Sequence, residues 1–337
     1  MSHALSSWVA LMTLLVVGAT STAASESLEV NALEYPWSAV GRLNASGVSY
    51  CSGVLVGERV VLTAAHCLYN QRGQRWWHPD ELHFVAGYQR GTFPIHSAIK
   101  AVIPADGYVF SEHPKPLVEI DDWALLELVD PIGRQAGWLG IEPLTTTMLE
   151  QLHNQGMPMV LAGYRFDRAQ VITIDRHCDV LGFVQDSQLV IHTCDAPQGD
   201  SGGPLLAFKN GEARVIALQA ISISINGRKL SGAVASTVLS DRGRWPRAVA
   251  AVTGAGVMSP APGRPPPAGG PASATPATTV AMLLRQAGTP DTDPPDADTS
   301  TTIRAFQRRH GLDVTGTASV ALLGTLLTDP NQRKSLP

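Results

Sequence analysis

Basic clusters are missing from this sequence, and long apolar stretches are missing beyond its N-terminus. The chain has 25 Lys and Arg against 29 Asp and Glu, a net charge of −4, and no basic run is interleaved with aromatic residues. A nucleic-acid-binding surface needs concentrated positive charge, so we exclude nucleic acid as a partner. Charged residues make up only 16% of the 337 residues and hydrophobic ones 44%. This balance is typical of a chain with a packed core and excludes a disordered one.

Cysteine is scarce, and the spacings that bind metal ions do not occur. The chain has four cysteines and no C-x-x-C pair, so we expect no zinc site. The acidic stretch 291–298 lacks the EF-hand spacing with its twelfth-position Glu, so we assign no calcium site either. We therefore expect neither a metal nor a cofactor. In an exported chain, four cysteines fit an oxidising compartment and allow three disulfide pairings.

The N-terminal residues 1–24 have the pattern of a secretory signal peptide. The apolar stretch 8–17 is too short to span a bilayer, and small residues follow it up to Ala24. No Lys or Arg precedes it, which leaves the amino terminus and His3 to supply positive charge. An uncleaved membrane anchor is the alternative. No later stretch approaches the roughly 18 apolar residues of a membrane span, so we expect no membrane contact after cleavage.

Three short segments supply the residue types of a nucleophilic site. A serine hydroxyl is a poor nucleophile at neutral pH, so Ser201 needs an imidazole to take its proton and a carboxylate to orient that imidazole. His66 and Asp122 can fill these roles. The glycines beside Ser201 allow a sharp turn and let the N–H groups of Gly199 and Ser201 point at a developing oxyanion. The segments are TAAHC at 63–67, DWALL at 122–126 and GDSGGP at 199–204.

In this chain order the three segments resemble those of the trypsin-like, chymotrypsin-fold serine endopeptidases. The resemblance implies that Ser201 is the nucleophile, that His66 is the general base and then acid, and that Asp122 orients His66. Gly199 and Ser201 would form the oxyanion hole. The reaction would be hydrolysis of a peptide bond in a protein or peptide substrate through an acyl-enzyme. The alternative is a catalytically silent envelope or peptidoglycan-binding scaffold, which nothing at the three positions supports.

Residues 25–253 carry short runs of Val, Ile and Leu broken by Gly, Pro, Asn and Asp. This pattern predicts an all-β domain but does not separate a sandwich from a barrel. The resemblance implies two six-stranded antiparallel β-barrels, with His66 and Asp122 in the first and Ser201 in the second. The family's cysteine positions imply the disulfides Cys51–Cys67 and Cys178–Cys194.

The residues around Ser201 suggest a bacterial secreted branch of the family, which places the protein outside the cell or in the periplasm. Cys194 lies seven residues before Ser201, not four as in digestive trypsins. That branch includes glutamyl endopeptidases, but Gln219 stands where their glutamate specificity needs a His. Asp195 matches the carboxylate at the bottom of the trypsin primary pocket, which predicts a preference for Lys or Arg; alternatively, it only binds its own loop. Ser222 stands where the family often has a small residue in the pocket wall.

Asp200 raises a question of activation. In animal digestive enzymes the Asp before the nucleophile pairs with a terminal ammonium that cleavage frees, but no Arg-Ile-Val-Gly-Gly sequence occurs here. Counting back from Pro36 by the usual interval reaches Ala24, so our hypothesis is that signal peptidase creates this terminus. The alternative is that local hydrogen bonds hold Asp200.

The last quarter of the chain predicts a linker and a small helical domain. Residues 254–278 are rich in Pro, Ala and Gly, and residues 279–330 are expected to form a three-helix domain with helices near 280–288, 301–310 and 320–327. The F-Q-x-x-x-G-L pattern at 306–312 resembles the peptidoglycan-binding domain of bacterial cell-wall enzymes, although Thr315 stands where Asp is usual. The alternative is a module that contacts other proteins or its own protease domain. The sequence gives no oligomeric state.

Overall fold

The structure is a computed structural model that describes residues 27–106, 108–110, 120–157, 159–184, 186, 188–225, 228–239, 262–287 and 299–329. The expected signal peptide, residues 1–24, lies outside the described residues.

Six antiparallel strands close into the first barrel. Alternate side chains of each strand point inward and fill its interior. Around the barrel the order is β2-β3-β4-β9-β8-β7. All five residues of β9 and all four of β4 are buried, and these two strands pair with each other. The strands are β2 (Val40–Ala45), β3 (Ser49–Leu55), β4 (Val60–Thr63), β7 (Leu82–Ala86), β8 (Ile95–Pro104) and β9 (Ala124–Leu128).

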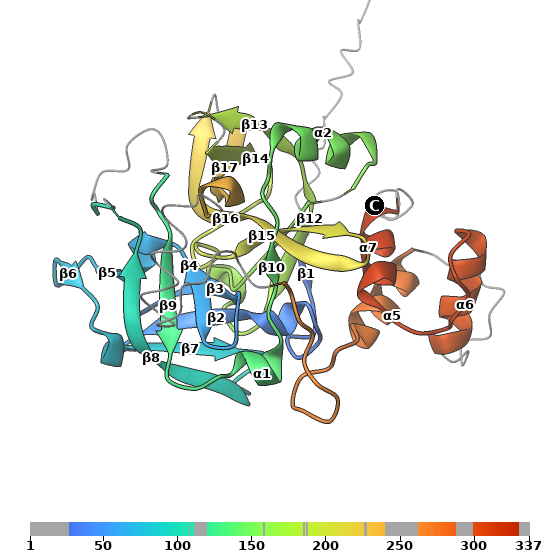
Figure 1. Cartoon of the computed structure of the whole chain (residues 1–337), viewed down its shortest axis with the longest axis horizontal. Coiled ribbons are helices and arrows are strands. Elements are labelled where there is room, and N and C mark those ends of the chain that lie inside the picture. Colours follow the sequence, from blue (N-terminus) through green and yellow to red (C-terminus); the bar gives the residue numbers. More distant parts are fainter. Residues whose placement is uncertain are drawn as a thin grey trace, which may run out of the picture.

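The second half of the protease region is a nine-stranded sheet that curls back on itself. Its order is β1-β12-β11-β15-β16-β17-β14-β13, and β10 pairs with β16. Only Asp179 separates β12 from β13 in the chain, so the two ends of the run of seven strands from β12 to β13 meet. The strands are β1 (Leu28–Glu29), β10 (Gly140–Ile141), β11 (Met159–Gly163), β12 (Thr173–Cys178), β13 (Val180–Val184), β14 (Leu189–His192), β15 (Pro204–Lys209), β16 (Glu212–Ile225) and β17 (Arg228–Ala235). The expected trypsin-like fold is confirmed (Figure 1).

Short helices and one hairpin decorate the two β regions. The longest of them, α2, begins at the N-cap Thr145, whose side chain accepts a hydrogen bond from the Met148 N–H. These elements are η1 (Trp37–Ala39), η2 (Ala65–Leu68), η3 (Pro79–Glu81), η4 (Phe166–Arg168), α1 (Gly133–Ala136), α2 (Thr146–Asn154), α3 (Ser236–Leu239) and the hairpin of β5 (Tyr69–Asn70) and β6 (Arg75–Trp76). None of the helices within the described ranges is long and apolar enough to cross a membrane.

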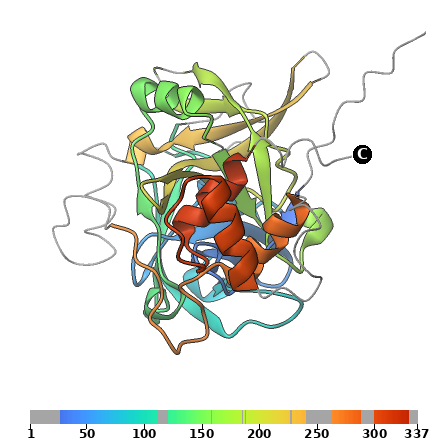
Figure 2. The same cartoon turned by 90° about the vertical axis from the view of Figure 1, so that its right-hand side faces the viewer.

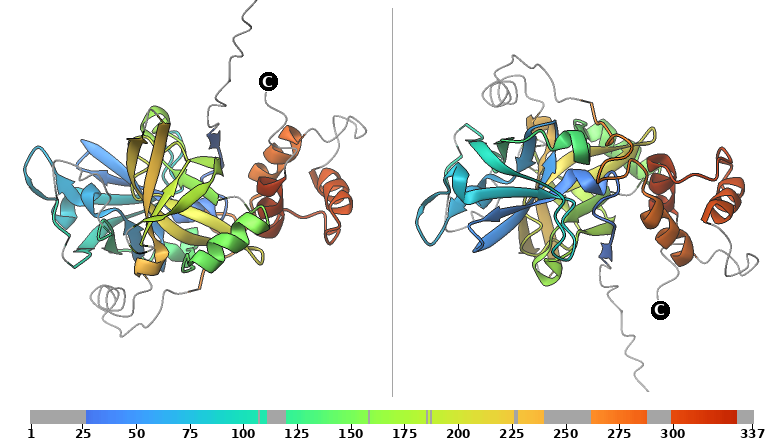
Figure 3. Two further views of the ribbon diagram at one scale, coloured as in Figure 1. Left: turned by 90° about the horizontal axis from the view of Figure 1, so that it is seen from above. Right: turned by 90° about the horizontal axis from the view of Figure 1, so that it is seen from below.

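Three helices follow the protease region, close to where the sequence predicts them. They are α5 (Ala277–Gln286), α6 (Thr299–Arg309) and α7 (Val320–Thr328). The apolar positions recur at helical spacing, so Leu283, Phe306 and Leu323 point inward and are buried. In the views from above and below, α6 is the outermost helix, and α5 and α7 lie between it and the sheet (Figure 3).

The helical domain is docked against the protease domain. Helix α7 packs on β15 and β16 (Figure 2), where the absence of a side chain at Gly324 makes room for Phe208. At the start of α5, the buried Glu34 carboxylate accepts hydrogen bonds from the N–H groups of Thr278 and Thr279, at 2.5 and 3.0 Å, and from the Thr279 hydroxyl at 2.8 Å. A carboxylate from the protease domain thus caps this helix and complements its dipole.

The linker also touches the protease domain. The Trp138 indole N–H donates to the Pro262 carbonyl at 2.8 Å, and the Ser273 N–H donates to the Leu33 carbonyl at 2.7 Å. The described part of the linker, residues 262–276, therefore runs along the protease surface. The predicted domain boundaries themselves stay predictions.

Candidate active site

Strand register brings His66 and Asp122 together. His66 follows β4 and Asp122 precedes β9, and these strands pair with Thr63 opposite Ala124. The His66 Nδ1 lies 2.8 Å from Asp122 Oδ2, and the His66 backbone N–H donates to Asp122 Oδ1 at 2.9 Å. The carboxylate thus binds both the ring and the backbone of one residue, which fixes the ring orientation. With Nδ1 donating to Asp122, Nε2 is left as the proton acceptor.

The charge of Asp122 changes the basicity of the imidazole. Burial of the His66 ring acts against its charged form, but the charge of Asp122 and the hydrogen bond to it outweigh that cost and raise the pKa of His66 above its ordinary value. A raised pKa strengthens His66 as a base. It also implies that activity is lost as the pH falls through this raised pKa, because the protonated ring accepts no proton.

The loop that carries Ser201 requires glycine at two positions. Gly199 has φ +95° and Gly202 has φ +78°, in the region that side chains disfavour. A Cβ on Gly199 would overlap the Tyr164 carbonyl oxygen, and one on Gly202 would overlap the Ser52 carbonyl oxygen. The glycines of the GDSGGP segment are therefore required by packing as well as by backbone conformation.

Two N–H groups of this loop are available to a ligand. Among the described residues, neither Gly199 N–H nor Ser201 N–H has an acceptor within hydrogen-bond distance. The loop around them is fixed, since the Gln198 carbonyl accepts a 2.7 Å hydrogen bond from Phe166 N–H and the Asp200 carbonyl accepts one of 2.8 Å from Gly203 N–H. The arrangement suits the predicted oxyanion hole.

Ser52 holds this loop in place, and the sequence does not indicate it. Its hydroxyl donates to the Gly199 carbonyl and accepts from Tyr164 N–H, each at 2.8 Å, and it is fully buried on β3. Its backbone N–H donates to the Ser201 carbonyl at 2.8 Å. One residue of the barrel thus positions the nucleophile loop that leads into β15 of the nine-stranded sheet. In the sequence, the one feature that marks this position is the neighbouring Cys51, which the family resemblance assigns to a disulfide.

His66, Gly199 and Ser201 line a single cavity of about 540 Å³, with the Cys51–Cys67 disulfide in its wall. The structure contains this disulfide and the expected Cys178–Cys194 one. Cys51, Cys67 and His66 lie close enough together to suggest a metal site, but both sulfurs are bonded to each other and are not available as thiolates.

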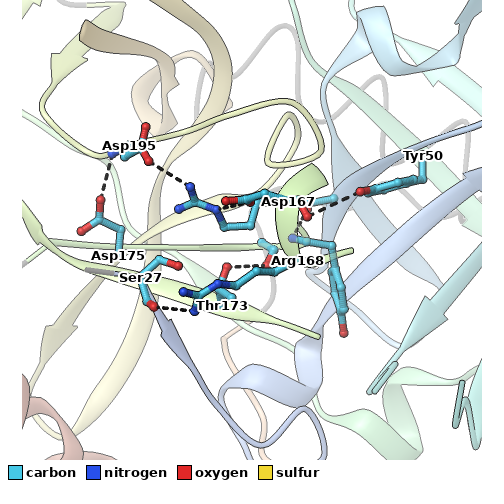
Figure 4. A network of polar contacts seen from close by, with 11 residues as sticks. Ser27, Tyr50, Asp167, Arg168, Thr173, Asp175 and Asp195 are labelled. Atoms are coloured by element: carbon cyan, nitrogen blue, oxygen red, sulfur yellow. Dashed lines mark hydrogen bonds and ion pairs between the residues drawn. The ribbon is translucent and has the colours of Figure 1, made fainter. Parts of the chain in front are cut away.

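Asp195 is engaged by another residue of the chain. Its carboxylate lies 2.9 Å from the guanidinium of the buried Arg165, which also binds Asp167 at 2.6 Å. The Asp195 N–H donates to the Asp175 carboxylate at 2.8 Å, and Figure 4 shows the two aspartates side by side. This is the loop contact that the sequence leaves open as an alternative to substrate binding. Ser222, the expected pocket-wall residue, donates its hydroxyl to the Ala196 carbonyl.

Asp200 is buried, 3% exposed, beside the nucleophile. Burial raises the pKa of its carboxyl well above the usual range, and the nearby Arg165 opposes the rise. Among the described residues its Oδ1 has no hydrogen-bond partner. The terminus that our hypothesis assigns to Asp200 lies outside the described residues, which begin at Ser27; Arg168 binds the Ser27 carbonyl (Figure 4).

A buried histidine makes stability depend on pH. His192 is fully buried on β14, and burial lowers its pKa to about 4. The folded state therefore resists protonating this ring, so stability present above about pH 6.5 is lost as the pH falls toward 4. We expect the loss to reach about 3 kcal/mol, because one pKa unit corresponds to about 1.4 kcal/mol.

Urea unfolding of wild type and His192→Gln at pH 7 and pH 4.5 tests this expectation. His66, whose pKa shifts in the opposite direction, is present in both proteins. Its contribution to the pH dependence of stability therefore cancels when the two losses are compared. The variant should lose less stability on acidification than the wild type. Equal losses would show that His192 does not carry the effect.

In the helical domain, the motif residues are used in folding. Phe306 is buried and stacks on His310 with 4.0 Å between ring centroids. The Gln307 side chain donates to the Thr315 hydroxyl and accepts from Gly316 N–H, each at 2.9 Å. These bonds tie the turn after α6 to the helix and account for the F-Q-x-x-x-G-L pattern. No glycan contact of Phe306 or Gln307 follows from these bonds.

Similarity to known proteins agrees with this geometry. The glutamyl endopeptidase of Bacillus licheniformis is 21% identical over 200 residues, covering 58% of this chain and 57% of that protein. Serine protease 23 of Bos taurus is 29% identical over 194 residues, covering 50% of this chain and 46% of that protein. Serine protease 56 of Mus musculus is 26% identical over 198 residues, covering 52% and 30%. The chain thus spans less than two thirds of the length of each relative.

A solved structure of a Glu endopeptidase in complex with MPD superposes with a TM-score of 0.51 at 18% identity, covering 64% of this chain and 93% of that one. At that identity the likeness concerns the fold. The family model for trypsin matches residues 26–237, more than half of the chain and the whole region that carries His66, Asp122 and Ser201. The chain belongs to the trypsin family.

Proposed function

We propose that this protein is a serine endopeptidase that works through Ser201, His66 and Asp122. The observation that carries the proposal is the 2.8 Å contact between His66 Nδ1 and Asp122 Oδ2 at a cavity that Ser201 and Gly199 also line. An oriented base, a serine and free N–H donors at one place are the requirements of acyl transfer.

The mechanism follows from these positions. His66 Nε2 takes the hydroxyl proton of Ser201 as its oxygen attacks the scissile carbonyl, and the N–H groups of Gly199 and Ser201 bind the oxyanion. His66 then gives the proton to the leaving amine, and the acyl group remains on Ser201. Water, deprotonated by His66, attacks this ester, and the proton returns to Ser201 as the acid product leaves. Asp122 stays ionised throughout and stabilises the imidazolium.

Hydrolysis of unfolded casein by the purified protein tests the proposal. The wild type should release peptides, and Ser201→Ala should lose about six orders of magnitude in kcat, the size established for removal of a triad serine. The Ser201→Ala protein should keep the wild-type circular dichroism spectrum and unfolding midpoint. A folded wild type without hydrolysis would favour the silent-scaffold alternative.

The primary pocket is a separate proposal. If Asp195 selects Lys or Arg before the cut, a basic substrate side chain must compete with Arg165 for its carboxylate. Cleavage of a peptide library decides this. A basic preference that disappears in Asp195→Ser supports the trypsin-like pocket, whereas an unchanged profile leaves Asp195 as a partner of Arg165 only.

We also propose export and binding to the cell wall. The predicted signal peptide and the two disulfides support a secreted or periplasmic protein. The helical domain would hold the protease near peptidoglycan, and its docking through Glu34 and α7 would keep the active site at a fixed distance. Sedimentation with purified peptidoglycan tests this. A protein that stays in the supernatant would leave the helices as a structural part of the protease.

The predicted mature terminus has its own test. If signal peptidase frees a terminus near Ala24 that pairs with Asp200, mass spectrometry of the active enzyme should find it there. An active enzyme that begins well beyond Val30 would exclude the hypothesis.

A further inference from the structure

The cavity beside Ser201 has three walls that come from different parts of the chain. Val48 and Tyr50 belong to the β2–β3 hairpin, and Tyr69 and Arg72 to the β5–β6 hairpin. Phe166 begins η4, between β11 and β12. A volume of about 540 Å³ exceeds what one side chain fills and is within the range of ligand pockets.

Two large apolar side chains stand exposed at this cavity. Val48 is 64% and Phe166 67% exposed. Single exposed apolar residues are ordinary, but two that line one cavity next to a nucleophile offer apolar surface that a ligand can cover. Burying them against a partner side chain would release water from both surfaces.

The walls are already ordered. The Arg42 guanidinium lies 3.9 Å from the centroid of the Tyr50 ring, and the Tyr50 hydroxyl donates to the Arg165 carbonyl at 3.5 Å. On the other wall, Tyr69 packs edge-on against Trp76 with 5.7 Å between centroids. A ligand therefore meets a preformed surface and loses little binding energy in ordering it.

The residues that line the cavity favour the leaving-group side of Ser201. Asp195 and Ser222, which mark the expected primary pocket, do not line it, whereas His66 does. A substrate crosses the nucleophile in one direction, so a cavity beside Ser201 that the pocket residues do not line is available to the residues after the cut. His66 is also the acid that protonates the departing amine, which must leave on that side.

Arg72 adds a charge to this site. It is exposed on the β5–β6 hairpin, and in the described part of the chain no carboxylate lies within ion-pair distance of it. A substrate carboxylate near it would gain a charge-assisted hydrogen bond without displacing a partner among those described residues.

We propose that this cavity selects substrates with a large apolar residue directly after the scissile bond, followed by an acidic residue. The proposal rests on the proposed serine endopeptidase function and names its substrate class. Val48, Tyr50 and Phe166 hold the apolar side chain, and Arg72 meets the carboxylate.

The partitioning of an acyl-enzyme between water and an added amine measures binding at this cavity separately from the primary pocket. The protein is acylated with p-nitrophenyl acetate, which carries nothing after the cut, and Ser201 releases p-nitrophenol. Amino-acid amides then compete with water: the amine attacks the Ser201 ester, forms an acetyl amide and returns Ser201. We expect leucinamide to capture about ten times more acetyl group than glycinamide, since burying a Leu side chain is worth at least one power of ten in affinity.

Variants with matched controls locate the effect. Phe166→Ala should reduce the leucinamide preference to about twofold. Phe93→Ala, which removes another exposed aromatic side chain that does not line the cavity, should retain the preference. With dipeptide amides, Leu-Asp should capture more acetyl group than Leu-Lys. Arg72→Glu should reverse that order, and Arg308→Glu on α6 should not.

The outcomes separate the two proposals. A wild type that forms no acetyl-enzyme contradicts the proposed function. A wild type that forms it but treats leucinamide and glycinamide alike, or whose preference survives Phe166→Ala, contradicts the leaving-side site while the endopeptidase proposal stands. Equal capture of Leu-Asp and Leu-Lys removes the role of Arg72.

Discussion

An Asp122→Asn protein is expected to fold like the wild type and to lose about four orders of magnitude in kcat, the effect established for this substitution in triads of the family. The geometry explains why. The Asn oxygen would accept the His66 backbone N–H, as Asp122 Oδ1 does at 2.9 Å, and the amide NH₂ would then face Nδ1. A donor facing Nδ1 leaves the proton on Nε2, so the imidazole presents an N–H to Ser201 and accepts no proton from it.

Steady-state hydrolysis of a peptide substrate at pH 8 measures this loss. Asp179→Asn, which changes an exposed carboxylate away from the cavity, is the matched control and should keep wild-type kcat. An Asp122→Asn protein with kcat within tenfold of the wild type would show that Asp122 does not set the tautomer of His66.

A Gly199→Ala protein is expected to lose at least two to three orders of magnitude in kcat, the cost of one oxyanion donor. The added Cβ would overlap the Tyr164 carbonyl oxygen, and the backbone at φ +95° disfavours any side chain. The peptide must therefore rotate or shift, and the Gly199 N–H turns away from the oxyanion. The expected pattern is a lower kcat with a smaller change in KM, because the oxyanion exists only in the transition state.

Gly91→Ala separates this effect from backbone strain. Gly91 has φ +82°, and a Cβ there would have nothing within 4 Å. Both variants should lose some stability from the unfavourable φ, which thermal unfolding measures. Only Gly199→Ala should lose activity. Equal activity of the two variants would mean that the Gly199 N–H does not bind the oxyanion.

The parts of the site that the sequence predicts correctly are those encoded in short segments. His66, Asp122 and Ser201 each lie in a local motif, and the chain order of these motifs is distinctive. The first barrel is predictable for a similar reason, since its buried strands are compact apolar runs such as β4 and β9. Once a barrel is assumed, pairing of those strands places His66 beside Asp122.

The sequence does not predict the contacts between polar residues that lie far apart along the chain. Ser52 binds Gly199 across 147 positions of the sequence, and Glu34 binds Thr279 across 245. A buried serine or glutamate has no local pattern that names its partner, because the partner is set by how distant parts of the chain pack against each other. The pairing of Asp195 with Arg165 belongs to the same class: the motif position of Asp195 suggests substrate binding, and the arginine opposite it becomes visible only in the fold.

The docking of the helical domain changes how the linker is understood. Its composition predicts an extended connection, but Trp138 and Leu33 bind its described part along the protease surface. The C-terminal helices are therefore held at one place on the protease domain. A domain on a flexible linker would instead move freely relative to it. Deleting them would expose Phe208 and the Glu34 carboxylate, both of which are buried in the full chain.

The central claim is that Ser201 is a nucleophile activated by His66. A fluorophosphonate probe, applied to the folded protein at pH 8 and followed by peptide mapping in a mass spectrometer, tests it most directly. The account predicts one adduct on the peptide that contains Ser201, labelling that is lost in Ser201→Ala, and labelling at least a thousandfold slower in His66→Ala. An adduct on another residue, or a folded wild type that the probe leaves unlabelled, would contradict it.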